Sequence, residues 1–194
     1  MQQDELTSKL RGFAMSKVVS WVRRQRERYR SDPRSGALRD DVRAALRSHF
    51  LPELLERARF VTLRAERAER PAFFDDLRAF GVSEAVLTSF TNVAAITYQD
   101  VVIMPSLHPG AENLPLIFHE LVHVVQYDDL GLEGFLGRYL DGWFSARGRH
   151  SSIPLEMDAY ALEKRFVEGR EAPFDVRAEV KRLLQASGSP DAAV

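Results

Sequence analysis

The sequence contains no cysteine among its 194 residues. A disulfide framework and a thiolate zinc finger are therefore both excluded, and any zinc must be held by imidazole and carboxylate groups, which is typical of catalytic sites. The N-terminal residues show no basic start followed by an apolar segment, and no apolar run approaches the roughly 18 residues that a membrane helix needs. We expect a cytoplasmic protein without a membrane span.

The chain also lacks a strong excess of charge of either sign, because its formal net charge is only -1. The charge is nevertheless unevenly distributed. Residues 1–70 carry 17 Lys and Arg against 10 Asp and Glu, and the remaining residues carry 10 against 18. Basic and acidic segments of one globular domain usually pack near each other, so we expect no nucleic-acid partner; binding of the basic segment to a nucleic acid or an anionic membrane is the alternative.

The most informative stretch is residues 114–127, LPLIFHELVHVVQY, which is apolar at nearly every position except His119, Glu120, His123 and Gln126. Two histidines four residues apart lie on one face of an α-helix, one turn from each other, so both imidazoles can reach a single ion. Glu120 lies about 100° around the helix from His119, where it can deprotonate a water held by that ion. The pattern is the zinc-binding HExxH motif; the alternative is a pair of core histidines with other hydrogen-bond partners.

Hydrophobic periodicity places helices over about residues 6–30 and 37–58, with Pro52 as a kink or break in the second. A short strand is expected at 60–63, a helix between Pro71 and Gly81, and a strand pair or hairpin over 92–98 and 101–104. After the motif, residues 132–144 predict a connecting helix beside it, and further helices are expected from about residue 154 and over 175–185. One domain of 194 residues is expected, with a helical part at 1–58, a core at 59–168 and a disordered tail at 186–194.

A catalytic zinc usually takes three protein ligands, so the sequence after His123 should supply one more. Asp129 has the spacing of an HExxHxxGxxD site, but Gln126 occupies the position of the glycine turn, so the helix is expected to carry Asp129 away from the metal. His150 lies in a polar loop and can serve as a ligand or as a hydrogen-bond donor to the transition state. Glu156 lies near the start of the next helix and is the preferred third ligand, because a helix holds it rigidly.

These residues carry a resemblance to a known group. The segments HELVHVVQ (119–126) and PLEMDAYALE (154–163) look like those of gluzincin zinc metallopeptidases, in particular small bacterial minimal gluzincin-like domains. The resemblance covers roughly residues 90–168. It implies His119, His123 and Glu156 as zinc ligands and Glu120 as the general base.

The chain departs from the gluzincin pattern in two ways. The 32 residues between His123 and Glu156 exceed the usual gap, and Tyr160 replaces the acidic residue usually found four positions after the third ligand. Asp158 is a nearby substitute for that acid, which normally orients a ligand histidine. Tyr139, Tyr160 and His150 are candidate hydrogen-bond donors to the transition state.

The sequence therefore predicts an α+β, zincin-like fold, mostly helical, with a small sheet or hairpin beside the motif helix. The predicted function is hydrolysis of a peptide or protein substrate by one zinc ion per chain, with Glu120 as general base. The alternative is a zinc-containing but catalytically inactive interaction module with the same fold, which uses its Arg-rich N-terminal helix to bind a partner.

Overall fold

The computed structural model describes residues 2–63, 70–79, 81–89, 93–105, 107–169 and 172–186. It shows a mixed α+β architecture, mostly helical, with one small three-stranded sheet. The helices are α1 (Gln2–Arg30), α2 (Asp40–Leu46), α3 (Pro52–Arg57), α4 (Phe73–Ala79), α5 (Glu84–Ser89), α6 (Leu114–Ser145), α7 (Pro154–Glu168) and α8 (Val176–Ala186), with short 3-10 turns η1 (Ala111–Asn113) and η2 (His150–Ser152). The strands are β1 (Arg59–Thr62), β2 (Ile96–Tyr98) and β3 (Val101–Met104).

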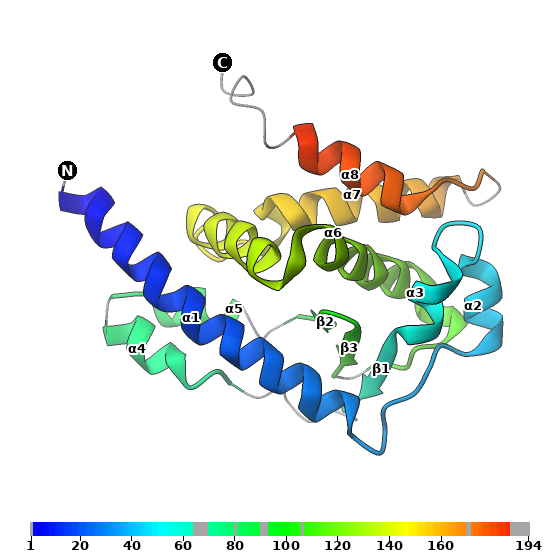
Figure 1. Cartoon of the computed structure of the whole chain (residues 1–194), viewed down its shortest axis with the longest axis horizontal. Coiled ribbons are helices and arrows are strands. Elements are labelled where there is room, and N and C mark those ends of the chain that lie inside the picture. The colour runs from blue at the N-terminus through cyan, green and yellow to red at the C-terminus, as the bar shows by residue number, and fades with distance from the viewer. Residues whose placement is uncertain are drawn as a thin grey trace.

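Helix α6 occupies the centre of the molecule, between the sheet and the pair formed by α7 and α8 (Figure 1). Its first half is apolar on almost all sides, as expected for a helix that other elements surround, and residues 117–127 are buried without exception. Pro115 stands in the first turn, where the missing amide hydrogen removes no helical bond. The motif residues are therefore placed in the interior, where their polar groups need partners.

Strand β3 lies in the middle of the sheet, parallel to β1 and antiparallel to β2. The predicted hairpin of β2 and β3 is confirmed, and its tight turn holds Gln99 at a φ of 60°. Asp100 in the same turn accepts hydrogen bonds from Arg26 (2.6 Å) and Arg30 (2.7 Å) of α1. Burial acts to raise the pKa of Asp100, but the two guanidinium groups outweigh it and the net pKa lies below its usual value. The ion pairs therefore fix the hairpin against α1.

Gly131 divides α6 into two helical halves, because its backbone has φ 69° and ψ 168°. Only glycine adopts such a conformation without strain. The bend turns the second half back beside the first, so that Phe135 stacks on Tyr127 and meets the edge of the His123 ring. The second half is the connecting helix predicted at 132–144, and it supplies one wall of the site.

The predicted helix over 37–58 is wrong as a single element. The structure has α2 and α3 instead, separated by a turn at residues 47–51, and α3 begins at Pro52, whose ring ends any helix that precedes it. The predicted helix of residues 71–81 is α4, and that of 175–185 is α8. Phe80 and Asn92, which the sequence placed at element ends, and the tail at 187–194 lie outside the described residues.

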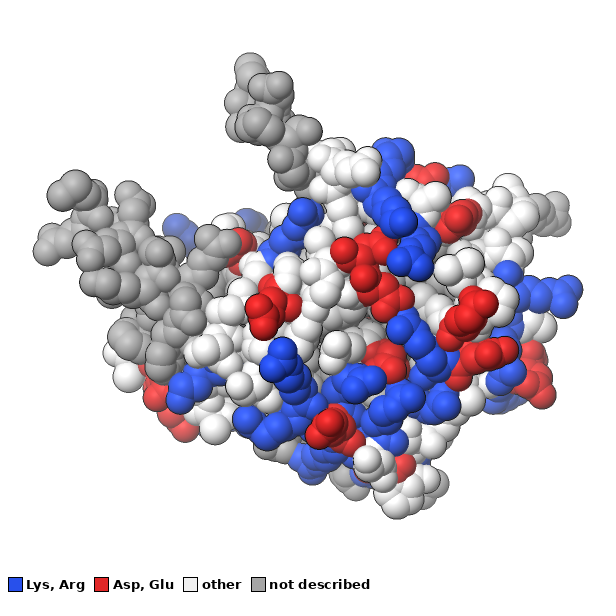
Figure 2. All heavy atoms as spheres, in the orientation of Figure 1, with Lys and Arg blue, Asp and Glu red and all other residues white. Residues whose placement is uncertain are grey.

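Among the helices that the structure describes, none has both the length and the apolar character needed to cross a membrane. Basic side chains gather over α1 and the neighbouring face, but acidic ones are interspersed with them (Figure 2). Arg26 and Arg30 are paired with Asp100, and Arg57 with Asp128. Much of the positive charge of the N-terminal part is thus neutralised within the fold.

We therefore predict no strong binding of nucleic acid to the Arg-rich end of α1. Fluorescence anisotropy with labelled DNA and RNA oligomers at about 50 and 200 mM salt tests this, because phosphate contacts release counterions and give steeply salt-dependent affinity. The prediction would be contradicted by a nucleic-acid affinity that depends steeply on salt and that disappears when Arg23, Arg24 and Arg28 are changed to Gln. Arg26 and Arg30, which pair with Asp100, stay unchanged in this variant.

His49 is a buried side chain far from the motif in sequence. Its ring meets Phe118, Phe166 and Phe174 edge to face, and the Phe174 amide approaches its Nδ1 at 3.5 Å. Burial lowers the pKa of His49 below its ordinary 6.5, the Phe174 amide acts in the opposite direction, and the positive charge of Arg165 lowers it further. The folded protein therefore holds this imidazole in its neutral form.

A group whose pKa is lower in the folded than in the unfolded state favours unfolding as it takes up a proton. We predict that His49 lowers the free energy of unfolding as the pH drops below about 6.5, so that between pH 7.5 and 5.5 His49→Phe, which has no imidazole at this position, loses less stability or gains more than the wild type. Urea unfolding at pH 7.5 and 5.5 measures this, with exposed His108→Gln as the control. Parallel pH profiles for the wild type and His49→Phe would refute it.

Candidate metal centre and pocket

Three side-chain atoms from two helices converge inside the protein. His119 Nε2 and His123 Nε2 lie 3.2 Å apart, and Glu156 Oε2 of α7 lies 3.1 Å from the first and 3.2 Å from the second. All three residues are buried. Ligand atoms about 2.0 to 2.1 Å from a tetrahedral ion lie roughly 3.3 Å from one another, so the triangle has the dimensions of one face of such a site. His119, His123 and Glu156 can together hold a metal ion.

His119 is oriented by a carboxylate that the sequence analysis did not identify. Its Nδ1 lies 3.0 Å from Glu163 Oε2. An ionised carboxylate only accepts hydrogen bonds, so Nδ1 carries the hydrogen and the lone pair of the neutral ring is on Nε2, facing the triangle. Glu163 follows Glu156 by seven residues, which is two helical turns, so both lie on one face of α7. This seven-residue spacing is the sequence feature from which the role of Glu163 could have been predicted.

His123 is oriented by Gln126, one turn later on α6. The Gln126 side chain is fully buried; its Nε2 donates to the Leu155 carbonyl at 3.0 Å, and its Oε1 lies 2.8 Å from His123 Nδ1. Oε1 therefore accepts the Nδ1 hydrogen, and the lone pair of His123 also faces the triangle from Nε2. The residue that replaces the glycine of an HExxHxxGxxD site thus connects the motif to the start of α7.

Glu156 receives further hydrogen bonds on the side away from the two motif histidines. His150 Nε2 lies 3.0 Å from its Oε1, and the Tyr139 hydroxyl also hydrogen bonds to this carboxylate. Burial and the Glu156 charge raise the pKa of Tyr139 well above its usual value, so its hydroxyl remains a donor at neutral pH. His150 therefore holds Oε1, which leaves Oε2 directed at the histidine pair, and Tyr139 adds a further hydrogen bond to the carboxylate.

The electrostatics of the triangle favour a positive charge at its centre. Burial acts to lower the pKa of His119, but the carboxylates of Glu156 and Glu163 raise it, to about 10. Burial likewise acts to raise the pKa of Glu156, but the neighbouring histidines bring it well below its usual value. The three groups thus favour a positive charge between them, which a proton or a metal ion can supply.

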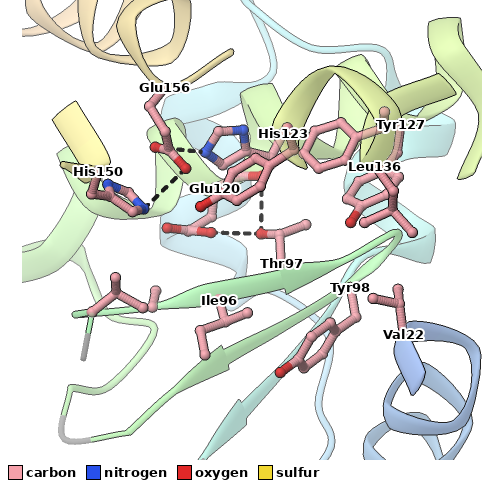
Figure 3. Close-up of a pocket in the computed structure, with 14 residues that line it drawn as sticks. Val22, Ile96, Thr97, Tyr98, Glu120, His123, Tyr127, Leu136, His150 and Glu156 are labelled. Carbon is pink, nitrogen blue, oxygen red and sulfur yellow. Dashed lines mark hydrogen bonds and ion pairs between the residues drawn. The ribbon is translucent and has the colours of Figure 1, made fainter. Parts of the chain in front are cut away.

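Glu120 lies beside the triangle and takes no part in it. Its Oε2 accepts a hydrogen bond of 2.6 Å from the Thr97 hydroxyl, which β2 presents to the motif helix. The side chain of Glu120 is buried but lines a pocket together with His123, Glu156 and His150 (Figure 3). The structure therefore places this carboxylate in the same pocket as two members of the triangle, where the sequence analysis expects a general base.

The remaining sequence candidates are placed differently. Asp129 is carried away on α6 and accepts hydrogen bonds from Arg177, as expected without a glycine turn. Asp158 is not brought to the centre, because it lines a separate groove with Arg138. Tyr160 is 43% exposed, and its ring lies 4.5 Å from that of His119. Tyr139 and His150 line the pocket beside Glu120, and Tyr160 does not.

Searches against known protein families, curated proteins and solved structures find no match to this chain. The function must therefore be argued from the site itself.

The seven-residue spacing of Glu156 and Glu163 leads to a prediction about metal binding. Hydrogen-bond partners of metal-bound histidines are typically worth 10- to 100-fold in metal affinity. We expect Glu163→Ala to weaken zinc binding by about that factor, and Asp158→Ala, on the same helix, to leave it unchanged. Competition with a chromophoric zinc chelator measures both affinities. If Asp158→Ala is the weaker binder, the roles of the two acids are reversed.

Proposed function

We propose that this protein is a zinc-dependent metallopeptidase with a zincin-like fold, similar in its site to the gluzincins. The observation that carries the proposal is the combination of a three-atom ligand face with an adjacent carboxylate that is not part of it. Two imidazoles and one carboxylate are a donor set typical of catalytic zinc, which keeps a further position open. When bound, zinc would polarise a peptide carbonyl and make a water molecule more acidic.

In this proposal Glu120 takes a proton from the attacking water and later returns it to the leaving amine. Thr97 holds the Glu120 carboxylate by its Oε2, which leaves Oε1 for the water. Glu163 and Gln126 keep the imidazole lone pairs directed at the ion, and His150 and Tyr139 do the same for Glu156. All these side chains reach the site from α6, α7, η2 and β2, so catalysis depends on how these elements pack.

The alternative of an inactive binding module would need no base beside the ion. The structure supports the enzyme instead, because Glu120 is buried, hydrogen bonded on one oxygen and open to the pocket on a side shared with two of the ligand residues. Burying a carboxylate costs free energy unless it is fully paired, and incompletely paired carboxylates of this kind are typical of functional sites.

Substitution of the two motif histidines tests the metal part of the proposal. The wild type should hold about one zinc per chain after removal of excess metal, and His119→Ala or His123→Ala should remove it. Elemental analysis of the purified variants gives the stoichiometry. Stoichiometric zinc in the double variant would show that the ion is held elsewhere.

Substitutions of Glu120 and of Glu156 should have different effects on zinc binding and on hydrolysis. Glu120→Gln keeps nearly the same shape and should retain zinc, while peptide hydrolysis falls about a hundredfold or more with the loss of the general base. Glu156→Ala should lose zinc affinity as well. Hydrolysis of a mixed peptide library, with zinc content for each variant, separates the two effects. Undiminished hydrolysis by Glu120→Gln would exclude the proposed mechanism, and a zinc-loaded wild type inert on every peptide would favour the binding module.

A further inference from the structure

The pocket beside Glu120 has two chemically different ends. The polar end contains Glu120 and the groups around Glu156. The other end is apolar and aromatic, and is formed by Val22, Ile96, Tyr98, Tyr127, Phe135 and Leu136 (Figure 3). Together the two ends line a cavity of about 60 Å³, room for several water molecules.

The apolar end is assembled from elements far apart in the chain. Val22 comes from α1, Ile96 from β2 and Leu136 from the half of α6 that follows Gly131. Each is anchored independently: Val22 is 2% exposed, the hairpin is tied to α1 through Asp100, and the Gly131 bend fixes the last wall. The space is thus built by the fold and needs no rearrangement to exist.

The charges around the pocket exclude several occupants. Among the described residues that line it there is no Lys or Arg, and its carboxylates are Glu120 and Glu156. An acidic side chain in the apolar end would meet no Lys or Arg among these residues and would lie near the two glutamates, whose charges repel it. A charged side chain of either sign in the apolar end would lose its hydration without a partner.

We propose that the apolar end of this pocket binds an uncharged aliphatic or aromatic side chain of the substrate, next to the bond that is cleaved. The substrate class is thus a peptide with an apolar residue beside the cleaved bond. This inference rests on the proposed function for the bond cleavage, but the side-chain preference is a property of the pocket alone.

Cleavage of a mixed library of end-blocked peptides, with the products sequenced, tests the preference. One position adjacent to the cleaved bond should favour apolar side chains over Asp, Glu, Lys and Arg by about tenfold or more, since a single misfit methylene group already costs that much. Cleavage without such a preference at either adjacent position overturns the inference and leaves the peptidase proposal standing.

Two variants link the preference to this pocket. Val22→Ala and Ile96→Ala each enlarge the apolar end, so the ratio of cleavage for Phe over Val at that position should rise several-fold. Val18→Ala removes the same atoms from a buried position of α1 that does not line the pocket, and should leave the ratio unchanged. An equal change in Val18→Ala, or no change in either pocket variant with the fold intact by circular dichroism, refutes the assignment.

Binding to the zinc-loaded Glu120→Gln variant separates this inference from the peptidase proposal. Blocked peptides that differ only in Leu, Phe, Asp or Lys at the central position are titrated by calorimetry or NMR. Tighter binding of the Leu and Phe peptides, altered by Val22→Ala, supports the pocket assignment even if the wild type cleaves nothing. Equal affinity for all four peptides overturns it, whether or not the wild type is a peptidase.

Discussion

Three lone pairs directed at one another in a buried space are the constraint on which the site depends. The Nε2 atoms of His119 and His123 and the Oε2 of Glu156 lie 3.1 to 3.2 Å apart, with hydrogens held on the far side of each imidazole. Such an arrangement is repulsive unless a cation lies between the atoms. The packing of α6 against α7 therefore requires either a metal ion or a proton at this point.

The orienting groups follow from helical geometry. Gln126 lies one turn after His123, and Glu163 lies two turns after Glu156, so each helix carries both a ligand and the group that orients a ligand histidine. Gln126 also connects the helices directly, because it bonds His123 of α6 and the Leu155 carbonyl at the start of α7. The site is consequently a property of one helix pair, while β2 and α1 supply the pocket beside it.

The sequence predicted the local parts of this arrangement well. The apolar surroundings of the HExxH motif, the hairpin and the early helical position of Glu156 are all short-range patterns, and the structure contains each of them. The first strand of the hairpin, predicted over 92–98, is shorter and begins at Ile96. The ligand set was predicted from spacing together with the resemblance to gluzincins, and the structure brings its three members within contact distance.

Long-range packing decided what the sequence could not predict. Thr97 meets Glu120 because β2 packs on α6. Val22 reaches the pocket because α1 packs on the hairpin, through the Arg26 and Arg30 ion pairs and through the contact of Trp21 with Tyr98. Glu163 was not predicted because the gluzincin pattern has its orienting acid four residues after the third ligand, where Tyr160 stands in this chain. The sequence predicted a kink or break at Pro52, but not that the preceding helix ends at Leu46, because apolar periodicity continues across the turn before Pro52.

X-ray absorption spectroscopy at the zinc edge tests the central claim most directly. Protein freed of metal by a chelator and reloaded with one equivalent of zinc should show a first shell of nitrogen and oxygen at about 2.0 to 2.1 Å, with outer-shell scattering from two imidazoles. A shell of oxygen alone, without imidazole scattering, would show that the ion binds outside the His119, His123 and Glu156 triangle and would contradict the account.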